Sequence, residues 1–199
     1  MAIRDALWAC PACHAFGAIR KDGSDEACSQ CAARFDRTGG ALIRMRDRHG
    51  DTVVRTLPEW ESLLPPLDQP PVNRVLGPQN ALVRNATPPA PVRVRGAFLG
   101  MAERFEPARE ATVMLDATRL IVRIVDGRQL TWPLEEITAV QPSSASLQVL
   151  GAGQPLVSIR FVEDSVRRWE ALLHHFIRQR CREIGRGEII EFNPRIRYA

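Results

Sequence analysis

Two pairs of cysteines near the start of the chain constrain its folding more than any other feature. Cys10 and Cys13 form one C-x-x-C pair, Cys28 and Cys31 form a second, and fourteen residues separate the two pairs. Four thiolates at this spacing can close a tetrahedral shell around one Zn²⁺ ion, with Zn–S bonds of about 2.3 Å. The spacing therefore predicts a single zinc ion held by all four cysteines.

The first pair also admits a different interpretation. Cys10-Pro11-Ala12-Cys13-His14 matches the C-x-x-C-H string that attaches a c-type haem, and a C-x-x-C pair can also be a redox dithiol. The second pair favours zinc over haem, while a redox dithiol or an iron centre stays open as an alternative. Because four cysteines are available, His14 is expected to be a bystander. A closed four-thiolate shell has no open position for water, so the site is expected to be structural.

The pattern resembles a zinc ribbon over about the first forty residues, with Gly17 and Gly23 between the pairs and Gly39-Gly40 after them. Zinc ribbons occur in nucleic-acid machines and also as plain structural caps, so nucleic-acid binding by the ribbon is an alternative function. The first fifty residues carry six acidic residues beside eight basic ones, which weakens this alternative. The basic residues are Arg4, Arg20, Lys21, Arg34, Arg37, Arg44, Arg46 and Arg48.

Hydrophobicity gives an expectation about the compartment. The chain has no run of the roughly 18 to 20 apolar residues that a membrane helix needs. No apolar segment of signal-peptide length precedes Cys10. We therefore expect a cytoplasmic protein, in which thiols stay reduced and paired cysteines indicate metal or redox chemistry rather than structural disulfides.

Composition divides the chain into four regions. We predict a zinc ribbon over residues 1–50, a proline-rich connector over 51–91, a β-rich domain over 92–184, and a strand with a basic tail over 185–199. Nine of the fifteen prolines lie between residues 58 and 91. Because proline lacks a backbone N–H, this stretch is predicted to contain no long helix and no central strand, only a short helical turn at 58–64.

The β-rich region is predicted to hold about seven short strands followed by one helix. Asp126-Gly127 is a strong hairpin signal between two of these strands. After them, apolar residues fall on one stripe of an amphipathic helix of about five turns, from Val166 to Cys181. Asp164-Ser165 is expected to cap its start and Gly185 to end it. The predicted fold class is therefore mostly β with one long C-terminal helix.

This region resembles the pleckstrin-homology (PH) superfold, most closely its GRAM and bacterial PH-like branches. The segment 115–121, LDATRLI, is similar to the L-T-x-x-R-L hairpin of that family, with Asp116 and Ala117 departing from it. The segment 132–140, WPLEEITAV, is similar to the P-L-x-x-I-x-x-V strand that follows. The resemblance implies a β-sandwich or barrel capped by an amphipathic helix. Some members bind phosphoinositides and others bind peptides, so the fold leaves the function open.

No catalytic motif stands out in the sequence, which contains no G-x-S-x-G elbow, P-loop, dinucleotide glycine run or H-E-x-x-H. We therefore expect a non-enzymatic interaction or adaptor module with a protein partner. The alternative is peripheral binding to anionic membranes through the PH-like domain and the basic C-terminus, where eight arginines accompany four glutamates from residue 166 onward. The candidate residues for an anionic ligand are Arg178, Arg182, Arg186, Arg195 and Arg197.

Overall fold

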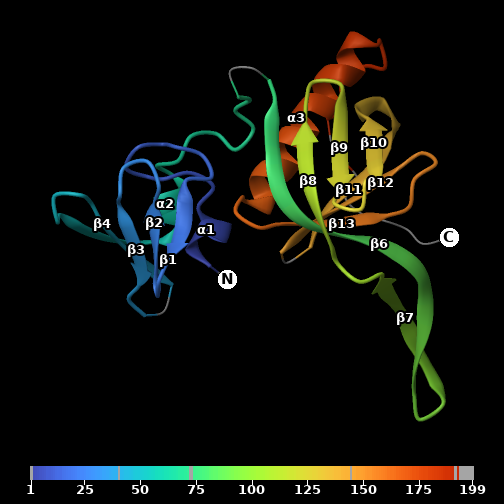
Figure 1. The fold of residues 1–199 in the computed structure, drawn as a ribbon, viewed down its shortest axis with the longest axis horizontal. Coiled ribbons are helices and arrows are strands. Elements are labelled where there is room, and N and C mark those ends of the chain that lie inside the picture. The colour runs from blue at the N-terminus through green and yellow to red at the C-terminus, as the bar shows by residue number, and fades with distance from the viewer. Residues whose placement is uncertain (1, 40, 72–73, 144, 191, 193–199) are drawn as a thin grey trace. The chain divides into compact units, whose positions relative to one another are not determined.

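The computed structural model describes residues 2–39, 41–71, 74–143, 145–190 and 192 (Figure 1). The chain divides into two compact units. The first unit comprises Met1–Pro70 and Glu163–Leu172, and the second comprises Pro71–Val162 and Leu173–Ala199. The fold is mostly β with one long C-terminal helix, as the sequence predicts.

The first unit is built on a five-stranded antiparallel sheet in which every strand pairs with its neighbour in sequence. This order arises because short turns join the strands. At the first of these turns Gly23 has φ +65°, a conformation that glycine adopts without steric cost. The strands are β1 (Ile19–Asp22), β2 (Asp25–Cys28), β3 (Arg34–Arg37), β4 (Leu42–Arg46) and β5 (Thr52–Thr56).

Two short helices complete the first unit, α1 (Ile3–Ala6) and α2 (Leu57–Glu61). The predicted helical turn is thus confirmed at α2. Glu59 fixes its start by accepting a hydrogen bond from the backbone N–H of Thr56, at 2.7 Å. On this helix, Trp60 is buried beside Phe35 and Ile43 and donates its indole N–H to the Ile43 carbonyl at 2.9 Å. Trp60 is therefore the centre of a small core that also contains Cys10 and Cys28.

The residues before and at the start of the last helix belong to the first unit. Asp164 and Arg168 form a buried ion pair there, with 3.9 Å between Oδ2 and Nη1. Asp164 also accepts hydrogen bonds from the Ser165 backbone N–H and the Trp169 indole N–H. The Arg168 guanidinium lies 4.1 Å from the centre of the Phe16 ring, so its charge is also supported by a cation–π contact.

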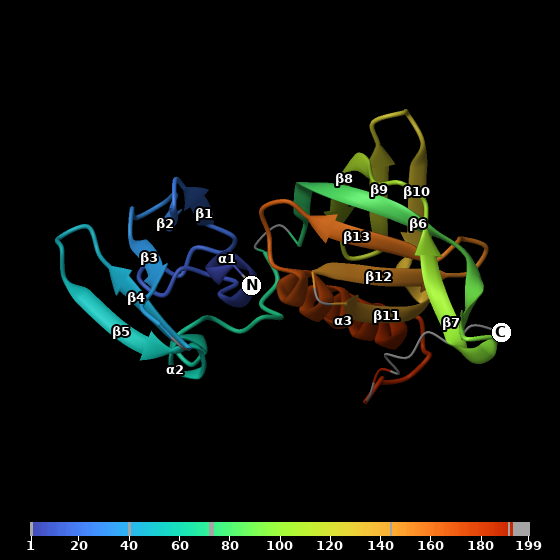
Figure 2. The same cartoon turned by 90° about the horizontal axis from the view of Figure 1, so that it is seen from below.

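The second unit contains an antiparallel sheet of eight strands. Seven follow one path in the order β10-β9-β8-β6-β13-β12-β11, which does not close into a barrel over the described residues, and β7 pairs with β6 off this path. Figures 1 and 2 show the two halves of the path on either side of β6. The strands are β6 (Leu76–Val94), β7 (Ala97–Phe105), β8 (Arg109–Leu115), β9 (Arg119–Ile124), β10 (Gln129–Pro133), β11 (Ile137–Ser143), β12 (Ser146–Gly151) and β13 (Val157–Phe161).

The prediction that residues 58–91 contain no central strand is wrong. β6 runs through this stretch and lies between β8 and β13. Three of its four prolines fall where the regular ladder is interrupted. Pro78 lies within a register shift against β8, and Pro88 and Pro89 lie within a register shift against β7. Because a bulged residue needs no ladder hydrogen bond, proline is tolerated at these positions.

The other predicted strands are formed between Ala111 and Phe161. The hairpin signal Asp126-Gly127 is confirmed, since it lies in the turn between β9 and β10 and Gly127 has φ +89°. Between β10 and β11 the chain makes one 3-10 turn, η1 (Leu134–Glu136). Along β9, β12 and β13 most side chains are buried, including the polar side chains of Gln148 and Ser158.

The long helix α3 (Val166–Glu183) confirms the predicted amphipathic stripe. The stripe residues Trp169, Leu172, Leu173, Phe176 and Ile177 are all buried. None of the helices in the described ranges is long and apolar enough to span a membrane.

The C-terminal end of α3 forms a Schellman motif at the predicted glycine. Gly185 has φ +75° and donates its N–H to Arg182, and the Arg186 N–H reaches the Cys181 carbonyl at 2.9 Å. The strand predicted at 188–192 is not formed over its described residues. No neighbouring strand pairs with the described residues of that segment. The Ile189 carbonyl instead accepts a hydrogen bond from Arg178.

Candidate metal centre

The two C-x-x-C pairs adopt the same local structure. After each first cysteine the chain turns back, so that the His14 N–H bonds the Cys10 carbonyl at 2.8 Å and the Ala32 N–H bonds the Cys28 carbonyl at 2.9 Å. One residue later, the Ala15 and Ala33 carbonyls accept the N–H groups of Cys10 and Cys28, respectively. His14 and Ala32 both have positive φ, at 59° and 60°. Each pair therefore forms a tight knuckle that presents its two sulfurs on one side.

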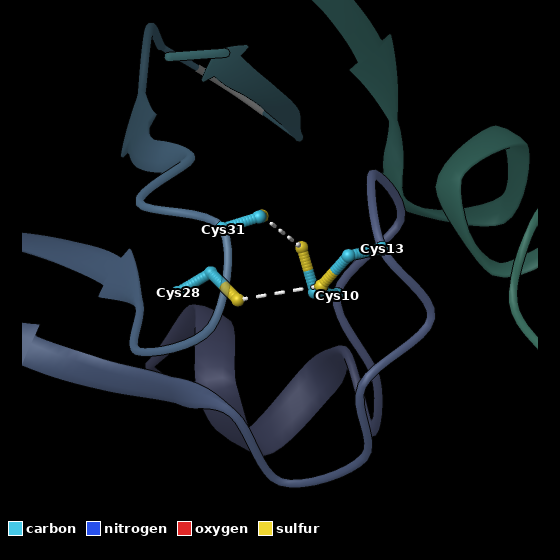
Figure 3. Close-up of side chains that lie close together, drawn as sticks. All are labelled: Cys10, Cys13, Cys28 and Cys31. Atoms are coloured by element: carbon cyan, nitrogen blue, oxygen red, sulfur yellow. Dashed lines mark hydrogen bonds between the residues drawn. The ribbon is translucent and has the colours of Figure 1, made fainter.

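The four sulfurs converge from these two knuckles (Figure 3). All four lie within 4.8 Å of one another. Cys10 and Cys31 are 3.6 Å apart between sulfurs, and Cys13 and Cys28 are 3.7 Å apart. A tetrahedral ion with bonds of about 2.3 Å requires sulfur separations of about 3.8 Å, whereas a disulfide requires about 2.05 Å. The cluster therefore has the dimensions of a metal site and not those of a pair of disulfides.

The cysteines differ in burial and in the pKa of their thiols. Cys10 and Cys28 are buried, Cys31 is half-buried and Cys13 is exposed. Burial raises the pKa of the Cys10 and Cys13 thiols. Burial acts in the same direction on Cys28, but backbone N–H groups of Cys31 and Gln30 outweigh it and lower the pKa of that thiol. Of these three thiols, Cys28 is the one whose surroundings favour the thiolate, the form that a metal requires.

The donor set determines what the site could hold. Four sulfurs in a tetrahedral arrangement suit zinc or iron, and they leave no position for a substrate or a reactive water. The ligand cluster found among the described residues consists of the four cysteines without His14. His14 lies in the knuckle turn with its backbone in the left-handed region. The predicted metal ligands are therefore brought together as a set.

The described arginines among those predicted to bind an anionic ligand each have a partner within the chain, and their role stays a prediction. Arg178 donates to the Ile189 carbonyl, and its guanidinium lies 4.7 Å from the Phe192 ring. Arg182 pairs with Glu188 at 3.4 Å, and Arg186 donates to the Glu135 carbonyl at 2.6 Å. Arg195 and Arg197 lie outside the described residues.

The basic residues of the first unit are partly neutralised by neighbouring carboxylates. Arg34 forms ion pairs with Asp22 and Asp25, and Arg44 forms one with Asp36 through two of its nitrogens. The Arg44 guanidinium lowers the pKa of the Asp36 carboxyl, which therefore stays ionised. Nucleic-acid binding by this unit stays a prediction.

A surface of the second unit whose exposed apolar residues the sequence did not indicate is the hairpin of β7 and the distal half of β6. In this hairpin β7 pairs with Ala86–Val94, and both strands run away from the rest of the sheet of their unit (Figures 1 and 2). Exposed apolar side chains gather near its tip, with exposed fractions of 59% for Phe98, 71% for Leu99 and 55% for Met101. Val92 and Val94 on β6 are also exposed. The signal that could have revealed the hairpin is the Arg95-Gly96 turn between two apolar runs.

Comparison with known proteins assigns the chain to no family. The sequence matches no protein-family model, and no curated protein is significantly similar to it.

Proposed function

We propose that this chain is a non-enzymatic interaction module in which a zinc-bound ribbon is a structural element and a PH-like domain docks a protein partner. The observation that carries the proposal is the exposed apolar tip of the β6–β7 hairpin. Folded proteins rarely expose contiguous apolar side chains of this size unless they bind something. Phe98, Leu99 and Met101 lie within four consecutive residues and are each more than half exposed.

The metal is proposed to be zinc with a structural role. A site of four thiolates closes the coordination shell, so the ion is expected to hold the knuckles together rather than to activate a substrate. The burial of Cys10 and Cys28 in the small core beside Trp60 supports this role, because loss of the ion would leave two buried thiols close to each other in that core. A non-enzymatic role for the chain agrees with this assignment.

The PH-like assignment of the second unit is supported by its strand order. The strands form two meanders, β6-β8-β9-β10 and β11-β12-β13, which are joined where β13 pairs with β6, and the last strand is followed by a helix. A bent sheet with one terminal helix is the arrangement that the resemblance to the PH superfold implies. In this assignment the β6–β7 hairpin is an extension of the connection between the first two core strands, β6 and β8. The length and sequence of such a connection can vary, because it lies outside the core.

Co-purification with a hairpin variant tests the proposal. The protein and its Leu99→Glu variant are used to capture partners from a lysate of the source organism, with Val125→Glu as a matched control. Val125 is 77% exposed in the turn region between β9 and β10, so the control adds the same charge elsewhere on the same unit. We expect a stoichiometric protein partner that Val125→Glu retains and Leu99→Glu loses. Equal capture by all three forms, or no partner at all, would contradict the proposal.

A second candidate function is docking to an anionic membrane, and one observation favours it. The hairpin tip carries Arg93 and Arg95 beside its apolar side chains, a combination that suits the interface of a negatively charged bilayer. Flotation with vesicles of phosphatidylcholine alone and of phosphatidylcholine with phosphatidylglycerol separates the two candidates. This second function requires binding to the anionic vesicles that weakens with salt and is lost in Leu99→Glu.

A further inference from the structure

We infer that the free edge of β7 is the docking element, and that the partner adds an extended strand to it in which apolar and acidic residues alternate. This inference rests on the proposed function, since it names the edge and the chemistry of the partner at the same hairpin.

The outer part of the hairpin is a two-stranded ribbon. Within the described residues β7 pairs with β6 alone. The strands are joined by the two-residue turn Arg95-Gly96, whose φ values of +50° and +84° match a type I′ turn. An isolated two-stranded hairpin is marginally stable in water, and a third strand that covers its apolar side chains would stabilise it.

The outer edge of β6 in this hairpin is closed to another strand. β13 pairs with β6 only as far as Asn85, so the following residues lie beyond it. Pro88, Pro89 and Pro91 fall in that part of β6 and have no N–H to donate. In a two-residue hairpin the pair next to the turn is hydrogen-bonded, and such pairs alternate along the ladder. By this alternation Pro91 stands at a position whose N–H would point outward, where its ring blocks strand addition.

The outer edge of β7 has no such protection. Phe98 pairs with Arg93, and Met101 pairs with Pro91. Phe98 follows the hydrogen-bonded pair at the turn, so its N–H and carbonyl groups point away from β6. A register shift between Val92 and Arg93 leaves Leu99 as an extra residue of β7. Counted along β6, which has no extra residue here, Pro91–Met101 is again a pair that is not hydrogen-bonded, so the same groups of Met101 also point outward. β7 contains no proline and no lysine, the residues that commonly protect an edge strand. The two edges of the ribbon therefore differ, since the β7 edge has outward N–H groups at Phe98 and Met101, on either side of the bulge at Leu99.

The charge of the hairpin specifies the chemistry of the incoming strand. Residues 90–102 contain Arg93 and Arg95 and no acidic residue, and both arginines are exposed. The acidic residues Glu103 and Glu106 come only at the base of the hairpin, where Glu103 accepts a hydrogen bond from Gln148. An acidic strand would meet two cations at the tip without opposing charges. Because Arg93 and Phe98 are a cross-strand pair, they share one face of the ribbon. The acidic residues of the added strand would lie on that face, and its apolar residues would cover Leu99 on the other.

The test uses two synthetic peptides of twelve residues, one in which valine alternates with glutamate and a twin in which lysine replaces every glutamate. Binding is measured by fluorescence anisotropy, and exchange of the Phe98 and Met101 amide protons is followed by NMR on the unsubstituted protein. We expect the glutamate peptide to bind at least tenfold more tightly than the lysine twin and to slow exchange of both amides at least tenfold. Equal affinity of the two peptides, or unchanged exchange of these amides, would overturn the inference.

Two variants at one position separate main-chain pairing from apolar contact. Met101→Pro removes an outward N–H, whereas Met101→Val keeps it and preserves a strand-forming side chain. Binding of the glutamate peptide should fall at least tenfold in Met101→Pro and less than threefold in Met101→Val. If a protein partner is lost in Leu99→Glu but retained in Met101→Pro, the proposed function stands and strand addition is excluded. If neither Leu99→Glu nor Met101→Pro reduces partner capture, the proposed function and strand addition are both wrong. Vesicle binding that requires Leu99 would then assign the hairpin to a membrane instead.

Discussion

The two cysteine knuckles show how little sequence is needed to specify a metal-binding turn. The segments 10–15 and 28–33 share only their cysteines and a final alanine, yet they form the same hydrogen bonds. In both, the residue after the second cysteine has positive φ, and in neither is it glycine. A non-glycine residue in the left-handed region carries a cost of about 1 kcal/mol. The hydrogen bonds that close each knuckle hold the backbone in this strained conformation.

Ala32→Gly should therefore stabilise the metal-bound protein. Glycine adopts the φ of +60° at this position without the steric cost that alanine bears, and the expected gain in unfolding free energy is about 0.5–1 kcal/mol. Ala33→Gly is the matched control, because Ala33 is fully buried and is not among the residues with positive φ, so its loss should destabilise. Chemical denaturation of the two variants checks the prediction. Equal destabilisation by both would show that the left-handed backbone at Ala32 is not strained.

His174 on α3 should make the second unit sensitive to mild acid. Burial, with a smaller contribution from Arg178, lowers the pKa of His174 to about 4. Its ring stacks on Phe192 with 4.0 Å between ring centres. In the unfolded chain the pKa of histidine is about 6.5, so between pH 6.5 and 4 the unfolded state binds a proton that the folded state does not. Stability should therefore fall through this window, by about 1–3 kcal/mol in total.

His174→Gln should remove this part of the acid sensitivity. The measurement is the difference in unfolding free energy between the protein and the variant at pH 7, 6, 5 and 4.5, which cancels titrations common to both. We expect the difference to shift in favour of the variant as the pH falls. A difference that does not change with pH would mean that His174 is as easily protonated in the folded protein as in the unfolded chain.

Among the elements, β12 shows how a single glycine permits close packing of the sheet. Gly151 ends this strand, and a Cβ atom at this position would overlap the buried indole of Trp132 on β10. Close-packed interiors have no free space to absorb such an overlap. The position therefore requires glycine for reasons of volume.

Gly151→Ala should destabilise the second unit by about 1–3 kcal/mol, because Trp132 or the β12 backbone must move. Gly100→Ala on β7 is the control, since a Cβ there meets no atom within 4 Å and the φ is not positive. Thermal unfolding followed by tryptophan fluorescence compares the two. A variant Gly151→Ala as stable as Gly100→Ala would contradict the packing described.

The same elements show what the sequence can predict. The strands after Ala111 and the α3 helix follow from the pattern because their residues are buried with regular periodicity, and Gly185 and Asp126-Gly127 mark their ends. β6 does not follow from the pattern, because proline excludes a regular ladder but not a bulged one. The exposed apolar tip of the hairpin was missed for a different reason. Its apolar residues carry no periodicity that distinguishes a docking surface from a core.

At the scale of the whole molecule, the two units differ in what stabilises them. The second unit has an extensive core that includes Trp132, Val113, Leu147 and Ile159. The first has a small core around Trp60 and Phe35, extended by two of the cysteines. A small domain of this kind commonly needs a metal to fold, because its apolar core alone does not offset the loss of conformational entropy.

Removal of the metal should therefore unfold the first unit selectively. With a strong chelator present, we expect amide exchange at Phe35 and Ile43 to accelerate by orders of magnitude, while Val113 and Ile159 stay protected. Hydrogen exchange with and without the chelator makes the measurement. Protection that persists at Phe35 would show that the core suffices without an ion.

The most direct test of the account is the metal content of the purified protein, measured by elemental analysis together with thiol titration. The account predicts one zinc ion per chain, four thiols released when it is removed, and no zinc in a Cys10→Ser, Cys28→Ser variant. Protein that contains no metal, or that holds Cys10, Cys13, Cys28 and Cys31 as disulfides, would contradict it.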